Sequence, residues 1–330
     1  MGNMIKKRIL SGMRPTGKLH LGNYVGALEN WIKLQDEFDS FHLIADYHML
    51  TTDLDTSSIN QNTIEMVTDW LATGLDPVKS PFFRQSKIKE HAELNLLFTM
   101  LITTARLERN PTLKDQVRDL HIESMTYGHL GYPVLQSADI LLYKGEVVPV
   151  GEDQVPHVEI TREIARKFNL QYGAVFPEPE ARLTKFARLP GLDGVAKMSK
   201  SLNNAVFLSD DADTVKAKMK KTITDPLKIR RGDPGRPEVC IVYMYQQKFN
   251  TVEHVSEIEA GCHSGVLGCV DCKLKVATCI NQILEPVLIK RKYYEDNIGE
   301  VKDILADGEK RGQAAARQTM SEVHEKMNLG

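Results

Sequence analysis

The sequence has no cysteine among its first 239 residues, because all five cysteines lie between Cys240 and Cys279. Its start lacks the long apolar run of a secretion signal, and Lys6 stands where a myristoylation motif needs serine or threonine. No internal repeat or disordered tail is evident. These absences predict a cytoplasmic protein without a membrane partner. In that compartment, metal or cofactor binding explains clustered cysteines better than disulfides do.

The overall charge is nearly balanced, with a formal net charge of −2 at pH 7. Such a chain does not coat nucleic acid over its whole surface, so any contact with RNA must come from one basic region. One stretch holds eight basic side chains: Lys216, Lys218, Lys220, Lys221, Lys228, Arg230, Arg231 and Arg236. They suit RNA phosphates, and a solvated helix face is the alternative interpretation.

With 330 residues, 42% of them hydrophobic, the chain is large enough for two domains. Up to about residue 190, short apolar runs alternate with amphipathic stretches, as in a parallel sheet covered by helices. Strands are predicted near 8–10, 41–45, 81–84 and 147–150. Helices are predicted from Ser57 or Ser58 to Gly74, over 93–103, from Pro133 to about Tyr143, and after Gln154. The polar stretch 106–118 is predicted to be a loop.

Beyond residue 183 the pattern changes to a Gly-, Lys- and Ser-rich stretch followed by long helical segments without clear strands. We place the domain boundary near 205, which gives an α/β domain over 1–205 and a mostly α-helical domain over 206–330. The last helix, over about 298–327, is expected to pack back on the first domain.

The stretch from Ser11 to Gly26 is typical of a strand, a turn and the start of a helix. We expect the helix to open between Lys18 and Leu21, with free backbone N–H groups and the positive end of its dipole facing a crevice. Such a place suits phosphate, although an ordinary strand–helix turn would have the same pattern. A second candidate is the sequence Lys197-Met198-Ser199-Lys200-Ser201, whose two lysines suit a polyphosphate that gains charge as a bond breaks.

Together, the stretch from Pro15 to Asn23 and the stretch from Lys197 to Ser201 resemble the paired HIGH and KMSKS motifs of class I aminoacyl-tRNA synthetases. The first motif ends in Asn23 where other class I enzymes have histidine, and asparagine is common there among tryptophan enzymes. Further stretches, among them 45–48 and 148–154, extend the resemblance to bacterial tryptophanyl-tRNA synthetases over residues 8–226. This resemblance implies a Rossmann-type catalytic domain and a helical domain that recognises the anticodon.

The resemblance implies a tryptophan site formed by Asp139, Gln154, Tyr132, Gln136 and His48. Tyr132, Gln136 and Asp139 share one face of a helix, because they stand at positions i, i+4 and i+7. Asp139 is expected to accept the indole N–H, which is the only polar group of that ring. A surface position for Asp139 is the alternative.

For ATP, the resemblance implies binding by both motifs and by neighbouring residues: Arg14, Thr16, Gly17, His20, Gly22, Asn23, Gly151, Lys197, Met198, Ser199, Lys200 and Ser201. Lys197, Lys200, Lys114 and His20 are expected to act in catalysis. The tryptophan carboxylate would attack the α-phosphorus and release pyrophosphate, with Mg²⁺ screening the charge, and the tryptophanyl group would then pass to tRNA(Trp). Positioning and positive charge suffice for this chemistry, because the carboxylate is already ionised at neutral pH.

Four cysteines, Cys240, Cys262, Cys269 and Cys272, suit zinc or an iron–sulfur cluster equally well by their number. Their spacing resembles that of a subset of tryptophanyl-tRNA synthetases with a [4Fe–4S] cluster, which we favour over Zn²⁺ and over buried free thiols. The set that replaces Cys240 by Cys279 stays open. The family resemblance also implies a homodimer. The alternatives to a tryptophan enzyme are a tyrosine–tRNA ligase and a non-catalytic RNA-binding or redox-sensing relative.

Overall fold

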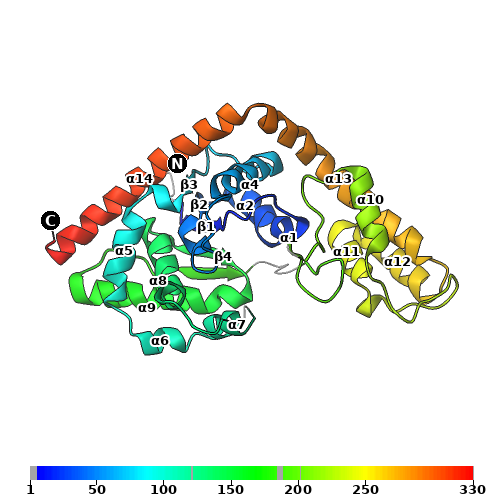
Figure 1. Ribbon diagram of the computed structural model, residues 1–330, viewed down its shortest axis with the longest axis horizontal. Helices are drawn as coiled ribbons and strands as arrows, with labels where there is room; N and C mark the ends of the chain where they lie inside the picture. The colour runs from blue at the N-terminus through cyan, green and yellow to red at the C-terminus, as the bar shows by residue number, and fades with distance from the viewer. Residues whose placement is uncertain (1–5, 120–121, 184–188, 201, 330) are drawn as a thin grey trace, which may run out of the picture. The chain divides into compact units, whose positions relative to one another are not determined.

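The computed structural model describes residues 6–119, 122–183, 189–200 and 202–329. In this part of the chain one parallel sheet has five strands in the order β3-β2-β1-β4-β5 (Figure 1). The strands are β1 (Arg8–Met13), β2 (Asp39–Ile44), β3 (Phe82–Arg84), β4 (Val147–Val150) and β5 (Glu180–Leu183). The predicted parallel sheet is therefore confirmed. Strand β5 was not predicted, since all four of its residues are exposed and it lacks an apolar run.

Helices join and follow these strands. They are α1 (Leu21–Asn23), a π-helical turn η1 (Tyr24–Leu28), α2 (Glu29–Leu34), α3 (Asp46–Met49), α4 (Ile59–Thr73), a 3₁₀ turn η2 (Gln85–Lys87), α5 (Glu90–Thr99), α6 (Thr104–Glu108), α7 (Pro111–Asp119), α8 (Tyr127–Leu142), a 3₁₀ turn η3 (Glu152–Gln154) and α9 (Val155–Tyr172). The chain runs from β1 outward to β3 and then returns to β4 on the other side of β1. In open parallel sheets, ligands bind beyond the carboxyl ends of the strands at such a reversal.

The remaining helices follow β5. They are α10 (Ala212–Lys221), a 3₁₀ turn η4 (Pro237–Val239), α11 (Ile241–Phe249), α12 (Val252–His263), α13 (Cys269–Asp296) and α14 (Ile298–Met327). None of the helices in the described ranges is long and apolar enough to cross a membrane.

The prediction of a loop over 106–118 is wrong, because α6 and α7 occupy most of that stretch. Its polar residues cap these helices. The Thr103 side chain accepts a hydrogen bond from the N–H of Arg106. The Asn110 side chain accepts one from the N–H of Thr112, next to Pro111 at the start of α7. Capping residues and turn residues are of the same types, so composition alone did not separate them.

The prediction that Pro133 opens a helix is also wrong. Helix α8 begins six residues earlier at Tyr127, where the Thr126 side chain accepts a hydrogen bond from the N–H of His129. Pro133 therefore lies inside the helix. The expected face with Tyr132, Gln136 and Asp139 is kept, since all three residues belong to α8.

By its internal contacts the chain forms two compact units. Unit 1 comprises the described residues of Met1–Gly17, Ala27–Ala187 and Asn297–Gly330, and unit 2 comprises those of Lys18–Gly26 and Arg188–Asp296. The expected boundary near 205 differs from this division, because residues 188–204 and the short segment 18–26 belong to unit 2. Helix α14 belongs to unit 1, in line with the expectation that the last helix packs back on the first domain.

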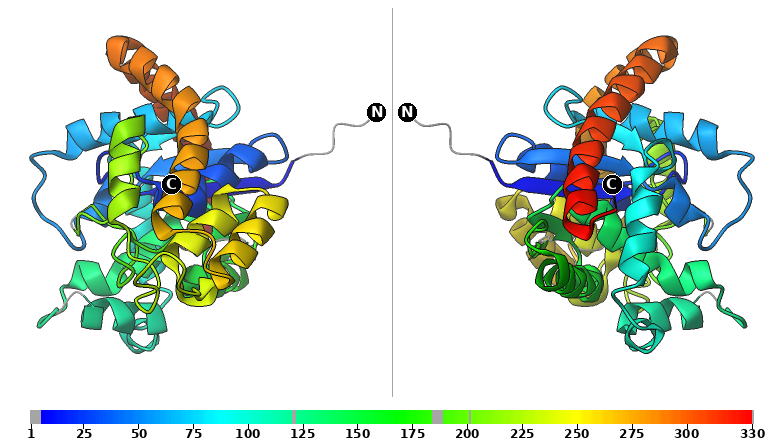
Figure 2. Two further views of the ribbon diagram at one scale, coloured as in Figure 1. Left: turned by 90° about the vertical axis from the view of Figure 1, so that its right-hand side faces the viewer. Right: turned by 90° about the vertical axis from the view of Figure 1, so that its left-hand side faces the viewer.

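Unit 1 holds the sheet and a large apolar core between β-strands and helices α5, α8 and α9. Val158, Ile164, Ala165 and Phe168 of α9 are buried in it. Helix α14 packs against β3, α5, α4 and α8, so a segment about 200 residues away in sequence covers the edge of the sheet. Figure 2 shows α14, in red, running beside α5, in cyan.

Unit 2 is mainly helical, with α10 and α11 packed against α13. Its core consists of buried side chains from these helices and from the stretch before α10: Val206, Leu208, Val215, Met219, Tyr245, Val276 and Ile280. The segment 18–26 joins this unit through backbone hydrogen bonds. Leu21 donates its N–H to the Val206 carbonyl, and Leu208 donates its N–H to the Leu19 carbonyl.

Candidate functional site

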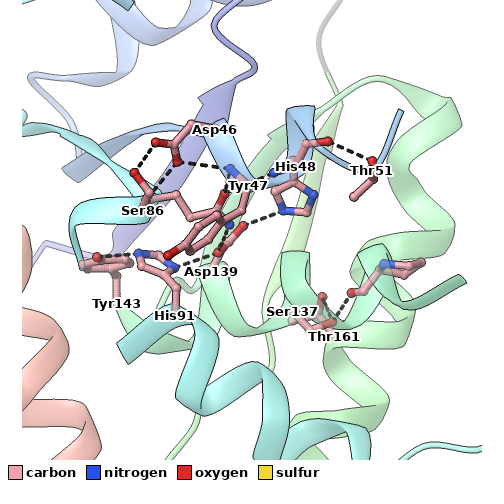
Figure 3. Close-up of polar contacts among 12 residues, drawn as sticks. Asp46, Tyr47, His48, Thr51, Ser86, His91, Ser137, Asp139, Tyr143 and Thr161 are labelled. Carbon is pink, nitrogen blue, oxygen red and sulfur yellow. Dashed lines mark hydrogen bonds and ion pairs between the residues drawn. The ribbon is translucent and has the colours of Figure 1, made fainter. Parts of the chain in front are cut away.

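Asp139 of α8 lies at the centre of a buried polar cluster at the carboxyl ends of β2 and β3 (Figure 3). Its side chain is 3% exposed. Its Oδ1 accepts hydrogen bonds from Gln85 Nε2 at 2.7 Å and from His91 Nδ1 at 2.7 Å. Its Oδ2 accepts a hydrogen bond from His48 Nε2 at 2.8 Å. The alternative of a surface position for Asp139 is therefore excluded.

The ends of two neighbouring strands place these partners. Asp46 follows β2 and accepts hydrogen bonds from the backbone N–H groups of Tyr47 and Ser86 and from the Ser86 hydroxyl. Gln85 follows β3, and its Oε1 accepts from the N–H groups of Tyr47 and His48. This fixes the amide of Gln85 so that its NH₂ group faces Asp139.

Asp139 is ionised at neutral pH in this environment. Burial raises the pKa of a carboxyl group, but the hydrogen bonds from His48 and His91 outweigh that effect and lower the pKa of Asp139 to about 2. An ionised carboxylate only accepts hydrogen bonds. Asp139 can therefore pair only with groups that donate a hydrogen bond.

Tyr132 stands two turns before Asp139 on α8 and near the His48 ring, with 6.4 Å between ring centroids. A chain of hydrogen bonds, separate from the one around Asp139, ends at the Tyr132 hydroxyl. Asn110 Oδ1 accepts from the Thr112 N–H, so its NH₂ donates to His157 Nδ1 at 2.9 Å, and His157 Nε2–H then donates to the Tyr132 hydroxyl oxygen at 2.8 Å. Burial lowers the pKa of His157 to about 4, which keeps this histidine neutral at pH 7. The Tyr132 hydroxyl is thus oriented with its own proton available to an acceptor.

The other two residues predicted to bind tryptophan are Gln136 and Gln154. Gln136 is half-buried, one turn after Tyr132 on α8. Gln154 ends η3, and its Nε2 donates to Asp153 at 3.1 Å. A cavity of about 220 Å³ opens beside Tyr132 and is lined by residues of α3, α5 and α8 and their flanks, including Tyr47, Thr51, Asn95, Thr99 and Leu135.

The first predicted ATP motif lies partly in unit 2. His20 caps α1: its Nδ1 accepts from the Asn23 N–H at 3.3 Å, and its own N–H donates to Asn23 Oδ1 at 3.1 Å. The Leu21 N–H is bonded to Val206 and the Gly22 N–H to Met198 Sδ at 3.3 Å. The expectation that free N–H groups open this helix is therefore wrong, because side chains and backbone of unit 2 satisfy them.

The second motif meets the first within unit 2. A Cβ built on Gly22 would lie 3.0 Å from the His20 ring and 3.3 Å from Met198 Cβ. Met198 is buried, while Lys197 and Lys200 on either side of it are exposed. Ser199 donates its N–H to Asn204 Oδ1, which shapes the loop. Ser201, also predicted to bind ATP, lies outside the described residues.

Burial lowers the pKa of His20 to about 4. This side chain is therefore neutral at pH 7, and its Nδ1 is committed to the Asn23 N–H as an acceptor. Nε2 consequently carries the ring proton and is the atom that can donate to a phosphate or ribose oxygen.

The remaining predicted ATP residues belong to unit 1. Arg14 follows β1, is exposed, and donates to the Thr52 hydroxyl at 3.0 Å. Thr16 is exposed, and Gly17 has a φ of 91°, a backbone conformation that favours glycine. Lys114 is exposed on α7, and Gly151 caps η3 after β4.

The cysteines lie at the ends of unit 2 helices. Cys240 precedes α11, Cys262 is near the end of α12, and Cys269 and Cys272 are in the first turn of α13. Cys240 and Cys269 lie close enough to Cys262 and Cys272 to raise the pKa of both thiols, whereas no other cysteine contributes to the pKa of Cys279. Within the described ranges, no group of three or more His, Cys, Asp or Glu side chains is placed to hold a metal ion.

Gln85 and His91 were not predicted from the sequence, although both contact Asp139 directly. A signal for Gln85 was present, because it directly follows a predicted strand, as Asp46 does. Because ligands of open parallel sheets bind beyond the carboxyl ends of the strands, the residue after β3 could have been predicted as a site residue in the same way. His91 carries no such signal, since it lies inside α5 and looks like an ordinary core residue.

The chain resembles known proteins over nearly its whole length. The family model described as class I tRNA synthetases (W and Y) matches residues 5–285. The tryptophan–tRNA ligase of Thermotoga maritima is 48% identical over 98% of this chain and 99% of that protein. The tryptophan–tRNA ligase of Aquifex aeolicus is 43% identical over 98% of this chain and 100% of that protein. The crystal structure of the Campylobacter jejuni tryptophanyl-tRNA synthetase, complexed with ADP and tryptophan, superposes with a TM-score of 0.85 at 33% identity, covering 98% of this chain and 100% of that one.

Proposed function

Since the chain belongs to the class I tRNA synthetases of the tryptophan and tyrosine group, we infer that its reaction is that of a tryptophan–tRNA ligase. It activates L-tryptophan with ATP to tryptophanyl-adenylate and pyrophosphate, and then transfers the tryptophanyl group to tRNA(Trp). The structural observation that supports this assignment is the buried, ionised Asp139, whose carboxylate can only accept hydrogen bonds. Indole offers one N–H donor and no acceptor, so the two groups are complementary.

In this proposal Asp139 accepts a hydrogen bond from the indole N–H, and polar side chains nearby bind the ammonium and carboxylate groups of tryptophan. Tyr132 offers its hydroxyl proton to the carboxylate, while Gln154 and Gln136 hold the ammonium and carboxylate groups with their amides. His48, between Asp139 and Tyr132, borders the ring. A phenylalanine side chain would leave the Asp139 carboxylate short of a donor, which costs on the order of 1–3 kcal/mol or more for a charged group.

The reaction needs positioning and positive charge. His20, Gly22 and Asn23 bind the nucleotide with Thr16, Gly17 and Gly151, and the exposed cations Arg14, Lys114, Lys197 and Lys200 bind the phosphate chain. The tryptophan carboxylate attacks the α-phosphorus, the bond to the β-phosphate oxygen breaks, and pyrophosphate leaves with the charge that the lysines and Mg²⁺ stabilise. Lys197 and Lys200 are both exposed, which supports this role because their ammonium groups can reach a ligand in solvent.

The helical unit 2 supplies the tRNA contact in this proposal. The basic stretch 216–236 keeps Arg230 and Arg231 exposed, whereas Arg236 is bonded to Asp225 and Lys228 is buried against the Cys262 carbonyl. The outward basic side chains suit phosphates of the anticodon region. A homodimer acting in the cytoplasm, with one tRNA contacting two subunits, completes the proposed assembly.

A [4Fe–4S] cluster is proposed at Cys240, Cys262, Cys269 and Cys272. The convergence of these four thiols, without Cys279, supports this set over the alternative one. Bound there, the cluster would tie the ends of α11, α12 and α13 together. Anaerobic purification with iron and sulfide analysis tests this, and zinc without iron would refute it.

The function is tested by ATP–pyrophosphate exchange with tryptophan, tyrosine and phenylalanine in parallel. We expect exchange with tryptophan at micromolar to millimolar concentration and none above background with phenylalanine. Exchange with tyrosine alone would assign the tyrosine enzyme instead. Absence of exchange with all three amino acids would favour the non-catalytic alternative.

A further inference from the structure

Asp139 has a limited number of acceptor positions, and most of them are occupied within the protein. A carboxylate offers about four lone-pair positions, two on each oxygen. On Oδ1 both are used, by Gln85 Nε2 and by His91 Nδ1, each at 2.7 Å. On Oδ2 one is used, by His48 Nε2 at 2.8 Å. One position on Oδ2 is left in the described structure.

Gln85 and His91, which donate to Oδ1, are each held in place by hydrogen bonds at their other polar atom. Gln85 is fully buried, and two backbone N–H groups occupy its Oε1. His91 is fully buried, and its Nε2 is bonded to the Tyr143 hydroxyl at 3.0 Å (Figure 3). Burial holds the pKa of Tyr143 well above its usual value, so this hydroxyl keeps its proton. Because the ionised Asp139 only accepts hydrogen bonds, Nδ1 of His91 carries a proton and donates it to Oδ1.

We propose that His91 and Gln85 are positioning residues for substrate selection: they saturate Oδ1 of Asp139 and leave a single acceptor position, on Oδ2, for one donor. Tyr143 acts through His91 in the same way. A substrate side chain with a single N–H donor fills the remaining acceptor position on Oδ2. A side chain without a donor leaves that position without a hydrogen bond. This inference rests on the proposed function and adds which oxygen of Asp139 meets the substrate and which residues set it.

The test compares tryptophan with a substrate that differs only in the donor. In L-β-(benzothiophen-3-yl)alanine a sulfur atom replaces the indole N–H. The variant His91→Leu removes the Nδ1 donor, and His91→Asn restores an amide N–H close to the same place. We expect His91→Leu to raise the KM for tryptophan in ATP–pyrophosphate exchange about tenfold, which is the worth of one hydrogen bond to a charged group. The KM for the sulfur analogue and the KM for ATP stay within about twofold, because neither depends on the placement of Oδ2.

Two further variants keep the test decisive if His91→Leu does not fold. His91→Asn should return the KM for tryptophan to within about threefold of the original protein. Tyr143→Phe keeps the buried ring and removes only the hydroxyl behind His91, so it should raise the KM for tryptophan about threefold and leave that for the analogue unchanged. A rise of the same factor for both amino acids, or no rise for either, would overturn the inference. Absence of exchange in the unmodified protein would instead overturn the proposed function.

Discussion

Gly308 of α14 lies directly against the backbone of Phe82 in β3: a Cβ built on the glycine would be 2.0 Å from the Phe82 carbonyl oxygen. Such a contact holds the helix close to the edge strand of the sheet, and no other residue type fits without moving one of the two elements. The neighbouring turn repeats the arrangement, since a Cβ on Gly312 would lie 2.9 Å from Ile88 and 3.0 Å from Phe83.

The variant Gly308→Ala is therefore expected to lower the free energy of unfolding by about 3 kcal/mol, because backbone atoms have to separate to admit the methyl group. The matched control is Gly299→Ala in the same helix, where nothing lies within 4 Å of the new Cβ. The control should be as stable as the original or up to about 1 kcal/mol more stable. Urea unfolding followed by circular dichroism measures both, and equal stability of the two variants would contradict the packing described.

The variant Asp139→Asn is expected to raise the KM for tryptophan about a hundredfold or more, since it removes the charge and turns one acceptor into a donor facing the donors around it. The KM for ATP should change little. ATP–pyrophosphate exchange at varied tryptophan and at varied ATP separates the two constants. A KM for tryptophan close to that of the original protein would remove Asp139 from the proposed site.

The variant Gly22→Ala places a methyl group 3.0 Å from the His20 ring and 3.3 Å from Met198 Cβ. Since both neighbours belong to the proposed ATP site, we expect the KM for ATP to rise about tenfold while the KM for tryptophan rises less. Gly299→Ala again serves as the control, because it adds the same methyl group far from both motifs in sequence. The opposite order of the two KM changes would contradict the assignment of Gly22 to the nucleotide.

The variants Lys197→Ala and Lys200→Ala test the loop that carries the second motif. Each is expected to lower kcat for exchange about a hundredfold with a smaller change in the KM for tryptophan, because the charge on the phosphates grows only as the bond breaks. Lys33→Ala removes another exposed lysine, which is paired with Glu29, and should leave kcat unchanged. A purely ground-state role for the lysines would appear as a change in the KM for ATP at constant kcat.

Stability is expected to fall as the pH drops below about 6.5, the pKa of an unperturbed histidine. Burial lowers the pKa of His42 to about 3 and that of His157 to about 4. Between these values and pH 6.5 the two histidines are protonated in the unfolded chain but not in the folded chain. The stabilisation is complete above pH 6.5 and is lost as the pH falls toward the folded values. Each group contributes a slope of up to about 1.4 kcal/mol per pH unit.

The variant His42→Phe isolates one of these groups. The His42 ring lies among Trp31, Trp70 and Phe82, with 4.6 Å between its centroid and that of Trp31, so an aromatic replacement fits the surroundings. We expect the loss of stability between pH 7 and pH 5 to be about 2 kcal/mol smaller than in the original protein. Urea titrations at the two pH values measure it. An unchanged difference would mean that His42 is not the neutral, buried group described here.

The sequence predicted those parts of the fold that have a strong local pattern. Strands β2, β3 and β4 are apolar runs bounded by polar residues, and α14 keeps a helical repeat over its whole length. It did not predict β5, whose side chains are exposed, or the start of α8, where Thr126 caps a helix that contains Pro133. These features depend on pairing and capping partners that local composition does not identify.

The site was predicted in the same uneven way. Asp139, His48 and Tyr132 were predicted from the family resemblance, and the structure places them near one another, while their roles stay predictions. The roles of His91 and Tyr143 depend on α5 packing against α8, a contact between segments about 50 residues apart in sequence. No local pattern encodes such a contact, so the residues that hold Asp139 in place emerged only from the three-dimensional arrangement.

The position of α14 has a consequence for how the protein is made. The ribosome delivers the strands of unit 1 first and the helix that covers β3 and α5 only after all of unit 2. Until α14 emerges, the backbone of β3 at Phe82 lacks the helix that covers it, and the sheet has an exposed edge there. Unit 1 therefore gains the cover of its sheet edge only after the helices of unit 2 have been made, and until then this edge is open to pairing with other chains.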